Sequence, residues 1–427
     1  MCTALVVGNI IGSGVFLLPA SLAPYGWNAL FGWVLTIAGA LALAYVFAKL
    51  SKAIPAGGGP YLYACEAFGQ GPAFVVAWSY WISLWIGNAA VATAAVSYLS
   101  VFVPALNTMP GLPAVVTVVL VWLFTAINLM GARVAGEVQL VTTVLKLLPL
   151  IAVAVLAAII IGGDGGASLA PFHAADISLP AITTSAALTL FALSGVESAT
   201  TPVGKVIDPE RTVPRATMIG TVLTGLIYIV VCSAVVLLAP AKQMAASSAP
   251  LADFVAAYWG PSARLWLSAF AAISALGALN GWILVQGEMP LAMARGGVFP
   301  AWMGRTTARG APVTAHLISS SLMTIIVLLN YAKSAGQIFT FMILLSTTAS
   351  LVMYLICALA ALRLAWAKRL DAKAAIFPVG MAAALYSVWT IIGAGLQAAV
   401  WGGALLLCGV PVYVLMKRAR RPISPPA

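Results

Sequence analysis

The chain alternates between long apolar stretches and short connections rich in glycine, proline and polar residues. An apolar stretch of about 20 residues is long enough to cross the hydrocarbon core of a bilayer as an α-helix. The pattern therefore predicts an all-α membrane protein with twelve transmembrane helices. We place them at residues 1–24, 28–50, 71–103, 112–131, 137–162, 181–202, 214–239, 262–295, 313–331, 336–362, 374–395 and 397–416.

Basic residues gather on one side of these predicted helices. If the N-terminus is cytoplasmic, only Lys242, Arg264 and Lys333 fall at outer helix ends, and most other Lys and Arg residues fall at inner ends. This asymmetry follows the positive-inside rule and predicts that both termini are cytoplasmic. The net charge of +11 is thereby explained by the membrane topology, because the excess basic residues lie at cytoplasmic helix ends, and no nucleic-acid partner is needed.

The composition excludes a water-soluble enzyme. Of 427 residues, 63% are hydrophobic and 7% are charged, against roughly 25% charged in ordinary soluble domains. The sequence contains no nucleotide-binding G-x-x-x-x-G-K-[ST] motif and no recognisable nucleophile with its base. Neither the five cysteines nor His173 and His316 have metal-site spacing. We therefore expect no enzyme activity, no cofactor and no metal.

Two glycine-interrupted stretches, residues 8–16 and 193–199, both contain Ser-Gly-Val inside an apolar segment. The first predicted helix runs outward and the sixth inward, so residues 1–162 and 181–362 would form two inverted repeats. Two further helices (374–416) and a basic cytoplasmic tail (417–427) would follow. Glycine also serves ordinary packing in membrane helices, but interruptions at matching positions of two halves are typical of a transporter's binding site.

An interrupted membrane helix exposes backbone groups that must meet a ligand or line a cavity. The N-terminal end of the outer half-helix suits a carboxylate, and the unwound carbonyls suit an ammonium group. Gly12 and Gly14 permit a close backbone approach, and Ser13 adds a hydroxyl donor. An α-amino acid offers both groups. Only residues 1–7 precede the first interruption, so we expect a short inner half of about two turns.

The motifs at residues 8–19, 80–88, 195–199 and 209–214, together with Gly281-Trp282, resemble those of the amino acid, polyamine and organocation (APC) superfamily. The likeness runs nearly end to end and is strongest to its bacterial arginine/agmatine antiporter branch. The resemblance implies a LeuT-type fold of 5+5 inverted repeats with broken helices 1 and 6. It also implies alternating-access exchange of amino acids or amines, a homodimer, and a place in the bacterial inner membrane.

By this resemblance, the substrate carboxylate would lie on Ser13 and Gly14, near Gly12. The α-amino group would meet carbonyls around Phe191 and Ser194. Ile10 would line the same end of the pocket.

At the side-chain end, the resemblance implies that Trp282 packs against the substrate and that Asn88 faces its far end, beside Ser83. A cation over Trp282 would gain of order 1 kcal/mol. Leu84 and Leu344 depart from this branch, which has small polar residues at the positions we assign to them. The N–H groups of a guanidinium would lack hydrogen-bond acceptors there, so arginine is disfavoured as the substrate.

Three further residues are candidates for gating and proton coupling. Tyr80 matches a gate-region aromatic, although aromatics also serve ordinary packing. Glu197 follows the second interruption and matches a carboxylate with a proton-sensing role; the alternative is a structural brace. Lys146 lies within a span, where a superfamily lysine replaces the coupling cation of sodium-driven relatives; the alternative is a lysine that extends to the interface.

Two functions remain open at this stage. The first is an exchanger of a basic amino acid for another amino acid or its decarboxylated amine. The second is a proton-coupled symporter of neutral amino acids, favoured by Lys146, Phe191, Leu84 and Leu344.

Overall fold

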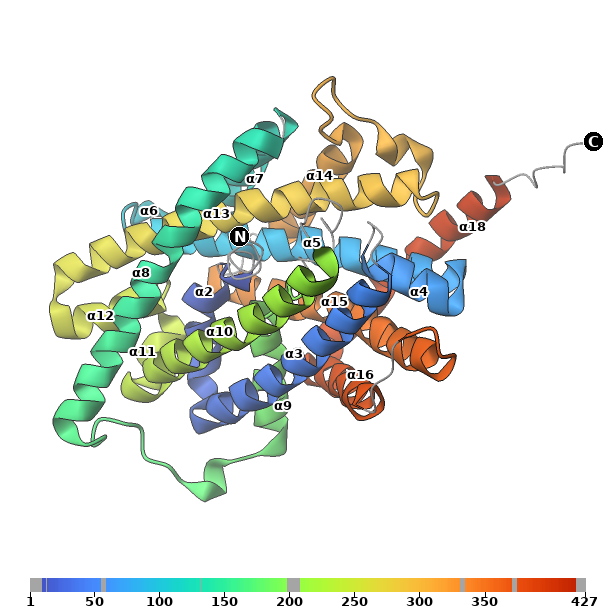
Figure 1. Ribbon diagram of the computed structural model, residues 1–427. Coiled ribbons are helices and arrows are strands. Elements are labelled where there is room, and N and C mark those ends of the chain that lie inside the picture. The colour runs from blue at the N-terminus through green and yellow to red at the C-terminus, as the bar shows by residue number, and fades with distance from the viewer. Residues whose placement is uncertain are drawn as a thin grey trace, which may run out of the picture.

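The computed structural model describes residues 10–12, 14–54, 59–130, 132–197, 208–330, 335–370 and 375–419. Over these ranges the chain is helical, and the extended pairing is confined to an isolated bridge between Thr306 and Pro312. Nine helical segments in the described chain are long and apolar enough to span a membrane, and three shorter apolar helices accompany them. Figure 1 shows them as one bundle.

The long helices follow the apolar stretches of the sequence. They are α3 (Trp27–Ala53), α5 (Gln70–Leu99), α7 (Leu112–Leu129), α8 (Ala132–Asp164), α10 (Pro209–Leu238), α13 (Pro261–Arg295), α15 (Ala335–Trp366), α16 (Ile376–Gly393) and the pair α17 (Gly395–Leu407) and α18 (Gly409–Ala419). The three shorter ones are α2 (Gly14–Leu22) with η1 (Ala23–Tyr25), α9 (Leu179–Ala192) and α14 (Val313–Leu329). Short helices α4 (Pro60–Phe68), α6 (Ala105–Thr108), η2 (Ala174–Asp176), α11 (Ala241–Ala246), α12 (Pro250–Trp259) and η5 (Ala301–Gly304) connect them.

Helix α5 forms the centre of the bundle. In its most apolar window 89% of the residues are buried, against 11% in the α17–α18 segment. Helix α5 packs along α15 and α13, while α18 projects at the periphery (Figure 1). The central helices can therefore carry polar side chains inward, and the peripheral helices present apolar side chains outward, as lipid contact requires.

The first and sixth apolar segments are both interrupted. The chain is helical at Ile10, bends at Ile11 and Gly12, and becomes helical again at Gly14. Helix α9 ends at Ala192, and the turns that follow reach Glu197. Both interruptions open toward the inside of the bundle, where backbone groups are shielded from lipid.

Hydrogen bonds fix the first interruption in place. The Tyr228 hydroxyl donates to the Ile10 carbonyl at 2.8 Å, and the Tyr98 hydroxyl donates to the Phe16 carbonyl at 2.6 Å. Tyr228 lies on α10 and Tyr98 on α5, so two packed helices hold the ends of the broken segment. A carbonyl freed by the interruption thus gains the donor it would lack in lipid.

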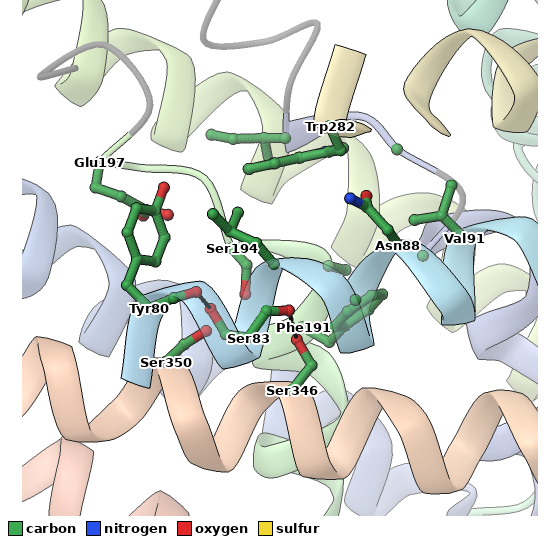
Figure 2. Close-up of a pocket in the computed structure, with 16 residues that line it drawn as sticks. Tyr80, Ser83, Asn88, Val91, Phe191, Ser194, Glu197, Trp282, Ser346 and Ser350 are labelled. Carbon is green, nitrogen blue, oxygen red and sulfur yellow. Dashed lines mark hydrogen bonds between the residues drawn. The ribbon is translucent and has the colours of Figure 1, made fainter. Parts of the chain in front are cut away.

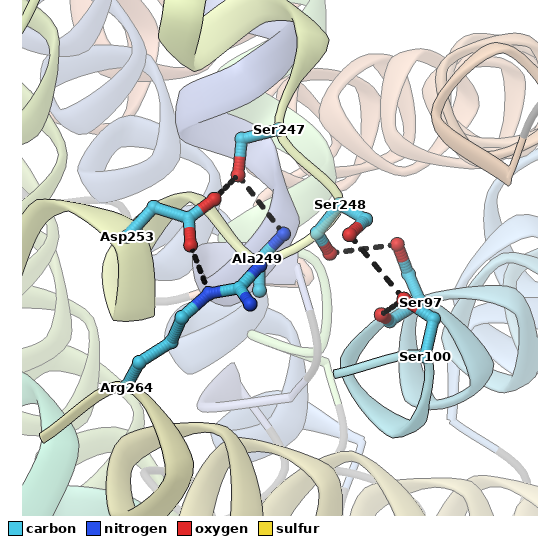
Figure 3. A network of polar contacts seen from close by, with 7 residues as sticks. All are labelled: Ser97, Ser100, Ser247, Ser248, Ala249, Asp253 and Arg264. Atoms are coloured by element: carbon cyan, nitrogen blue, oxygen red, sulfur yellow. Dashed lines mark hydrogen bonds and ion pairs between the residues drawn. The ribbon is translucent and has the colours of Figure 1, made fainter. Parts of the chain in front are cut away.

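A polar network ties the α11–α12 connection to the end of α5 (Figure 3). Ser97 donates to the Ser248 carbonyl at 2.7 Å. Asp253 accepts from Ser247 and pairs with Arg264, with 2.5 Å between Oδ1 and Nε. The connection is thereby held beside α2, against which α11 and α12 pack.

Candidate substrate pocket

A pocket lies in the middle of the bundle, between the two interrupted segments and the helices α5, α13 and α15 (Figure 2). Its volume is about 50 Å³. The residues that line it are Ile10, Gly12, Gly14, Tyr80, Ser83, Leu84, Gly87, Asn88, Val91, Phe191, Ala192, Ser194, Glu197, Trp282, Ser346 and Ser350. Segments far apart in the sequence therefore meet at one small cavity, the usual form of a small-molecule site.

One end of the pocket is made of backbone. Helix α2 begins at Gly14, so its first N–H groups have no partner within the helix and give this end partial positive charge. A Cβ on Gly14 would lie 3.3 Å from the Cα of Ala192 and from a ring carbon of Phe191. Glycine therefore lets the two interrupted segments approach each other closely.

The second interrupted segment contributes a tight turn. Ser194 N donates to the Phe191 carbonyl at 3.2 Å, and the Ser194 hydroxyl donates to the Leu190 carbonyl at 3.2 Å. Gly195 has a φ of +109°, and a Cβ there would lie 3.1 Å from Trp282 Cζ2. Trp282 thus covers this turn, and only a glycine leaves room for its ring.

Ser83 on α5 and Ser346 on α15 line one wall of the pocket, and both hydroxyls are already used as donors. Ser83 donates to the Tyr80 carbonyl at 2.7 Å, and Ser346 donates to the Ser83 carbonyl at 2.8 Å. Asn88 Nδ2 donates to Gln286 Oε1 at 2.7 Å. The lone pairs of these hydroxyls, and the Asn88 carbonyl oxygen, remain as acceptors along this wall. Such a wall suits a ligand group that donates hydrogen bonds.

A buried carboxylate closes the end of the pocket opposite Asn88 (Figure 2). Glu197 is 2% exposed, and its Oε2 accepts from the Tyr354 hydroxyl at 2.7 Å. Tyr354 lies on α15, and the Tyr80 ring on α5 points toward the same carboxylate. Glu197, on the second interrupted segment, is therefore linked to α15 and lies beside α5.

Most residues that the sequence singled out meet at this pocket. Ile10, Gly12, Gly14, Tyr80, Ser83, Leu84, Asn88, Phe191, Ser194, Glu197 and Trp282 all line it. Ser13 lies outside the described residues. Lys146 is fully buried on α8 but is not among the lining residues.

Leu344 is not brought to the pocket. It packs near Ala187 and Ala398 and lines a separate hollow at the junction of α16 and α17. The pocket-facing residues of α15 are instead Ser346 and Ser350. Two residues along an α-helix correspond to a rotation of about 200°, so Leu344 faces away from α5 when Ser346 faces it. Our assignment of an apolar α15 residue to the substrate's far end is therefore corrected to a serine.

The sequence reading missed Gly87, Val91, Ala192, Ser346 and Ser350. Two signals were available. Leu84, Gly87, Asn88 and Val91 follow the three- and four-residue spacing of one helix face, and Ser346 and Ser350 repeat at four residues within an apolar helix. Gly87 also has a structural reason, since a Cβ there would lie 3.1 Å from Ser346 Oγ.

Within the described ranges, no group of His, Cys, Asp or Glu side chains is arranged to hold a metal ion. The chemistry of this pocket is therefore that of its backbone ends, hydroxyls, amide, carboxylate and aromatic rings.

Comparison with known proteins agrees with this arrangement. A family model described as amino acid permease matches residues 2–414. The cadaverine/lysine antiporter of Escherichia coli (strain K12) is 38% identical over 343 residues, which cover 78% of this chain and 75% of that protein. The putrescine transporter PotE of Haemophilus influenzae is 29% identical over 418 residues, 96% of this chain and 94% of that protein. PotE of Escherichia coli (strain K12) is similar to the same degree, 29% over 419 residues. This multi-pass membrane chain therefore belongs to the amino acid permease family of the APC superfamily, as its motifs indicated.

Proposed function

We propose that this protein is a secondary transporter that exchanges a basic amino acid for its decarboxylated amine by alternating access, with lysine and cadaverine as the leading pair. The observation that carries the proposal is the pocket itself, which brings the N-terminus of α2, a wall of hydrogen-bond acceptors and the Trp282 ring around one cavity. A zwitterion with a cationic side chain offers a matching group to each of them. The names of the relatives support an amino acid and a diamine as the exchanged pair.

At the backbone end, the carboxylate lies against the first N–H groups of α2 at Gly14, with Ser13 as a further donor. The α-ammonium lies against carbonyls of the second interruption, around Phe191 and Ser194, and Ile10 borders it. Each charged group of the amino acid thus meets partial charge of opposite sign.

At the side-chain end, lysine fits better than arginine. The ammonium is a compact donor that three single acceptors can satisfy, whereas a planar guanidinium carries five donors in a fixed fork. Leu84 stands where a further polar partner for a guanidinium would be needed. Trp282 adds a cation–π contact of order 1 kcal/mol for either side chain.

Glu197, Tyr354 and Tyr80 form a gate in this proposal. The 2.7 Å bond from Tyr354 joins the interrupted segment to α15, so it must break or move when the segment tilts. A buried carboxylate that gains or loses a proton changes the strength of that bond, which gives exchange a dependence on pH.

The finer architecture is part of the same proposal. We propose twelve membrane-spanning helices: two inverted repeats of LeuT type, at residues 1–162 and 181–362, and two further helices. This arrangement would place both termini in the cytoplasm. The protein would be a homodimer in the bacterial inner membrane. The interruptions before Gly14 and after Ala192, at matching positions of the two halves, support this arrangement.

Lys146 motivates the alternative of proton-coupled symport of neutral amino acids. Its side chain is fully buried on α8, away from the residues that line the pocket. A lysine outside the pocket lining would act on transport through helix movement rather than through a contact with the substrate. In a symporter, Lys146→Ala abolishes the response to a pH gradient; in an exchanger, lysine–cadaverine exchange persists.

Counterflow in proteoliposomes tests the proposal. Labelled lysine should enter vesicles loaded with lysine or cadaverine and should not enter empty vesicles. Labelled neutral amino acids and labelled arginine serve as competing substrates in parallel vesicles. Uptake of neutral amino acids into empty vesicles, driven by an inward proton gradient, would overturn exchange and establish the symporter.

A further inference from the structure

Gln286 lies directly behind the pocket and is not one of its lining residues. It follows Trp282 by four residues on α13, so the two side chains leave the same face of the helix one turn apart. Trp282 reaches the pocket, while Gln286 is fully buried deeper in the bundle. Burying an amide in a membrane helix costs free energy unless its donor and acceptor are hydrogen-bonded.

The Gln286 amide is only half satisfied within the protein. Its Oε1 accepts from Asn88 Nδ2 at 2.7 Å, and its Nε2 has no hydrogen-bond partner among the residues that the structure describes. An unpaired buried donor costs about 1–3 kcal/mol. Among the described residues, the side-chain interaction that Gln286 makes is the bond to Asn88.

That bond determines which end of the Asn88 amide is available to a ligand. The amide nitrogen of Asn88 is used by the bond to Gln286 on α13, so the carbonyl oxygen is the end of this pocket-lining amide that a ligand can meet. Ser83 and Ser346 line the same wall with their hydroxyl hydrogens already donated to carbonyls. If Asn88 were free to rotate, it could present its NH₂ group instead and repel an ammonium.

We propose that Gln286 is a positioning residue that holds the Asn88 carbonyl oxygen toward the pocket and so selects an alkylammonium side chain over an uncharged one. This inference rests on the proposed function, since it concerns the side-chain end of the same site. Gln286 acts through Asn88 and touches no substrate.

Binding of lysine and norleucine to the purified full-length protein tests the inference. Norleucine has the carbon skeleton of lysine without the ε-ammonium, so the ratio of the two affinities reports the side-chain end alone. Gln286→Met keeps the length of the side chain and removes the acceptor. We expect the preference for lysine over norleucine to fall about tenfold or more, as for loss of a hydrogen bond to a charged group. Gln286→Glu, which keeps an oxygen acceptor, should retain the preference.

A double-mutant cycle separates positioning from a general structural effect. In an Asn88→Ala background, Gln286→Met should change the ratio no further, because the residue through which it acts is gone. An equal loss for both ligands, an unchanged ratio, or additive effects in the double variant would each overturn the inference.

The affinities of the wild-type protein for lysine and norleucine test the proposed substrate. A wild-type protein that does not prefer lysine to norleucine overturns the proposed substrate. The inference then falls with it, whereas a wild-type preference for lysine that survives Gln286→Met overturns the inference alone.

Discussion

Replacement of Gly195 by alanine tests whether the second interrupted segment positions Trp282. Gly195 has a φ of +109°, which L-residues with a Cβ rarely adopt, and its added Cβ would lie 3.1 and 3.2 Å from Trp282 Cζ2 and Cη2. The backbone strain costs of order 1–3 kcal/mol. The contact is closer than ordinary van der Waals distance, so the indole must move by a few tenths of an ångström.

Gly260 provides a matched control for this variant. It has a φ of +85° at the junction of α12 and α13, and a Cβ there would meet nothing within 4 Å. Gly260→Ala therefore introduces backbone strain without displacing an aromatic ring. The difference between the two variants isolates the contact between the turn and Trp282.

We expect both alanine variants to lower the melting temperature of the detergent-solubilised protein. Only Gly195→Ala should weaken lysine binding, because the displaced indole loses part of a cation–π interaction worth about 1 kcal/mol, or roughly fivefold in affinity. Calorimetric titration of lysine against each variant measures this. Equal affinities of the two variants for lysine would refute the reasoning that the glycine turn places the tryptophan.

Four other substitutions each alter one contact, and that contact sets the expected result. Tyr354→Phe removes the donor to Glu197, a hydrogen bond worth about 1.5–3 kcal/mol when the acceptor is charged, and should lower the melting temperature. Glu197→Gln keeps an acceptor for that hydroxyl without a titratable group, so lysine should still bind while the pH profile of exchange flattens; an unchanged profile contradicts the gate. Asp253→Asn weakens a pair with Arg264 that is partly exposed on both sides, so thermal unfolding should register no more than about 1 kcal/mol. Gly393→Ala places a Cβ against the backbone carbonyl oxygen of Thr183 on α9, and overpacking of this kind should lower the free energy of unfolding by about 1–3 kcal/mol, measured by thermal melting.

The course of the helices could be predicted from the sequence because lipid leaves the chain few alternatives. Apolar length set the positions of α5 and α13 to within a few residues at each end. The final predicted helix, 397–416, differs: it is divided at Cys408 into α17 and α18. Gly409 and Pro411 follow this division, and both residues weaken the helical ladder.

The orientation of individual helices about their axes was harder to predict. Glycine clusters mark an interruption directly, so Gly12 and Gly14 could be assigned to the pocket from the sequence. Helix α15 has hydroxyl residues on several sides, at Thr340, Ser346, Thr347, Thr348 and Ser350, so the four-residue repeat of Ser346 and Ser350 alone is a weak guide to its pocket-facing side. The packing of α15 against α5 determines which side faces the pocket, and the hydrogen bond from the Ser346 hydroxyl to the Ser83 carbonyl marks that side. The spacing along each helix indicates a shared face, but it does not show which partner helix that face meets.

An exchanger of an amino acid for its decarboxylated amine must bind two ligands that differ by one carboxylate. The groups common to both ligands are the ammonium ends and the alkyl chain, so the affinity shared by both has to come from the Trp282 and Asn88 end and from the unwound carbonyls. The N-terminus of α2 at Gly14 then acts on the amino acid alone. It follows that changes at Asn88 or Gln286 should weaken lysine and cadaverine together, whereas a change confined to the first turn of α2 should weaken lysine and spare cadaverine. Parallel losses of both ligands from an α2 variant would mean that the carboxylate is bound elsewhere.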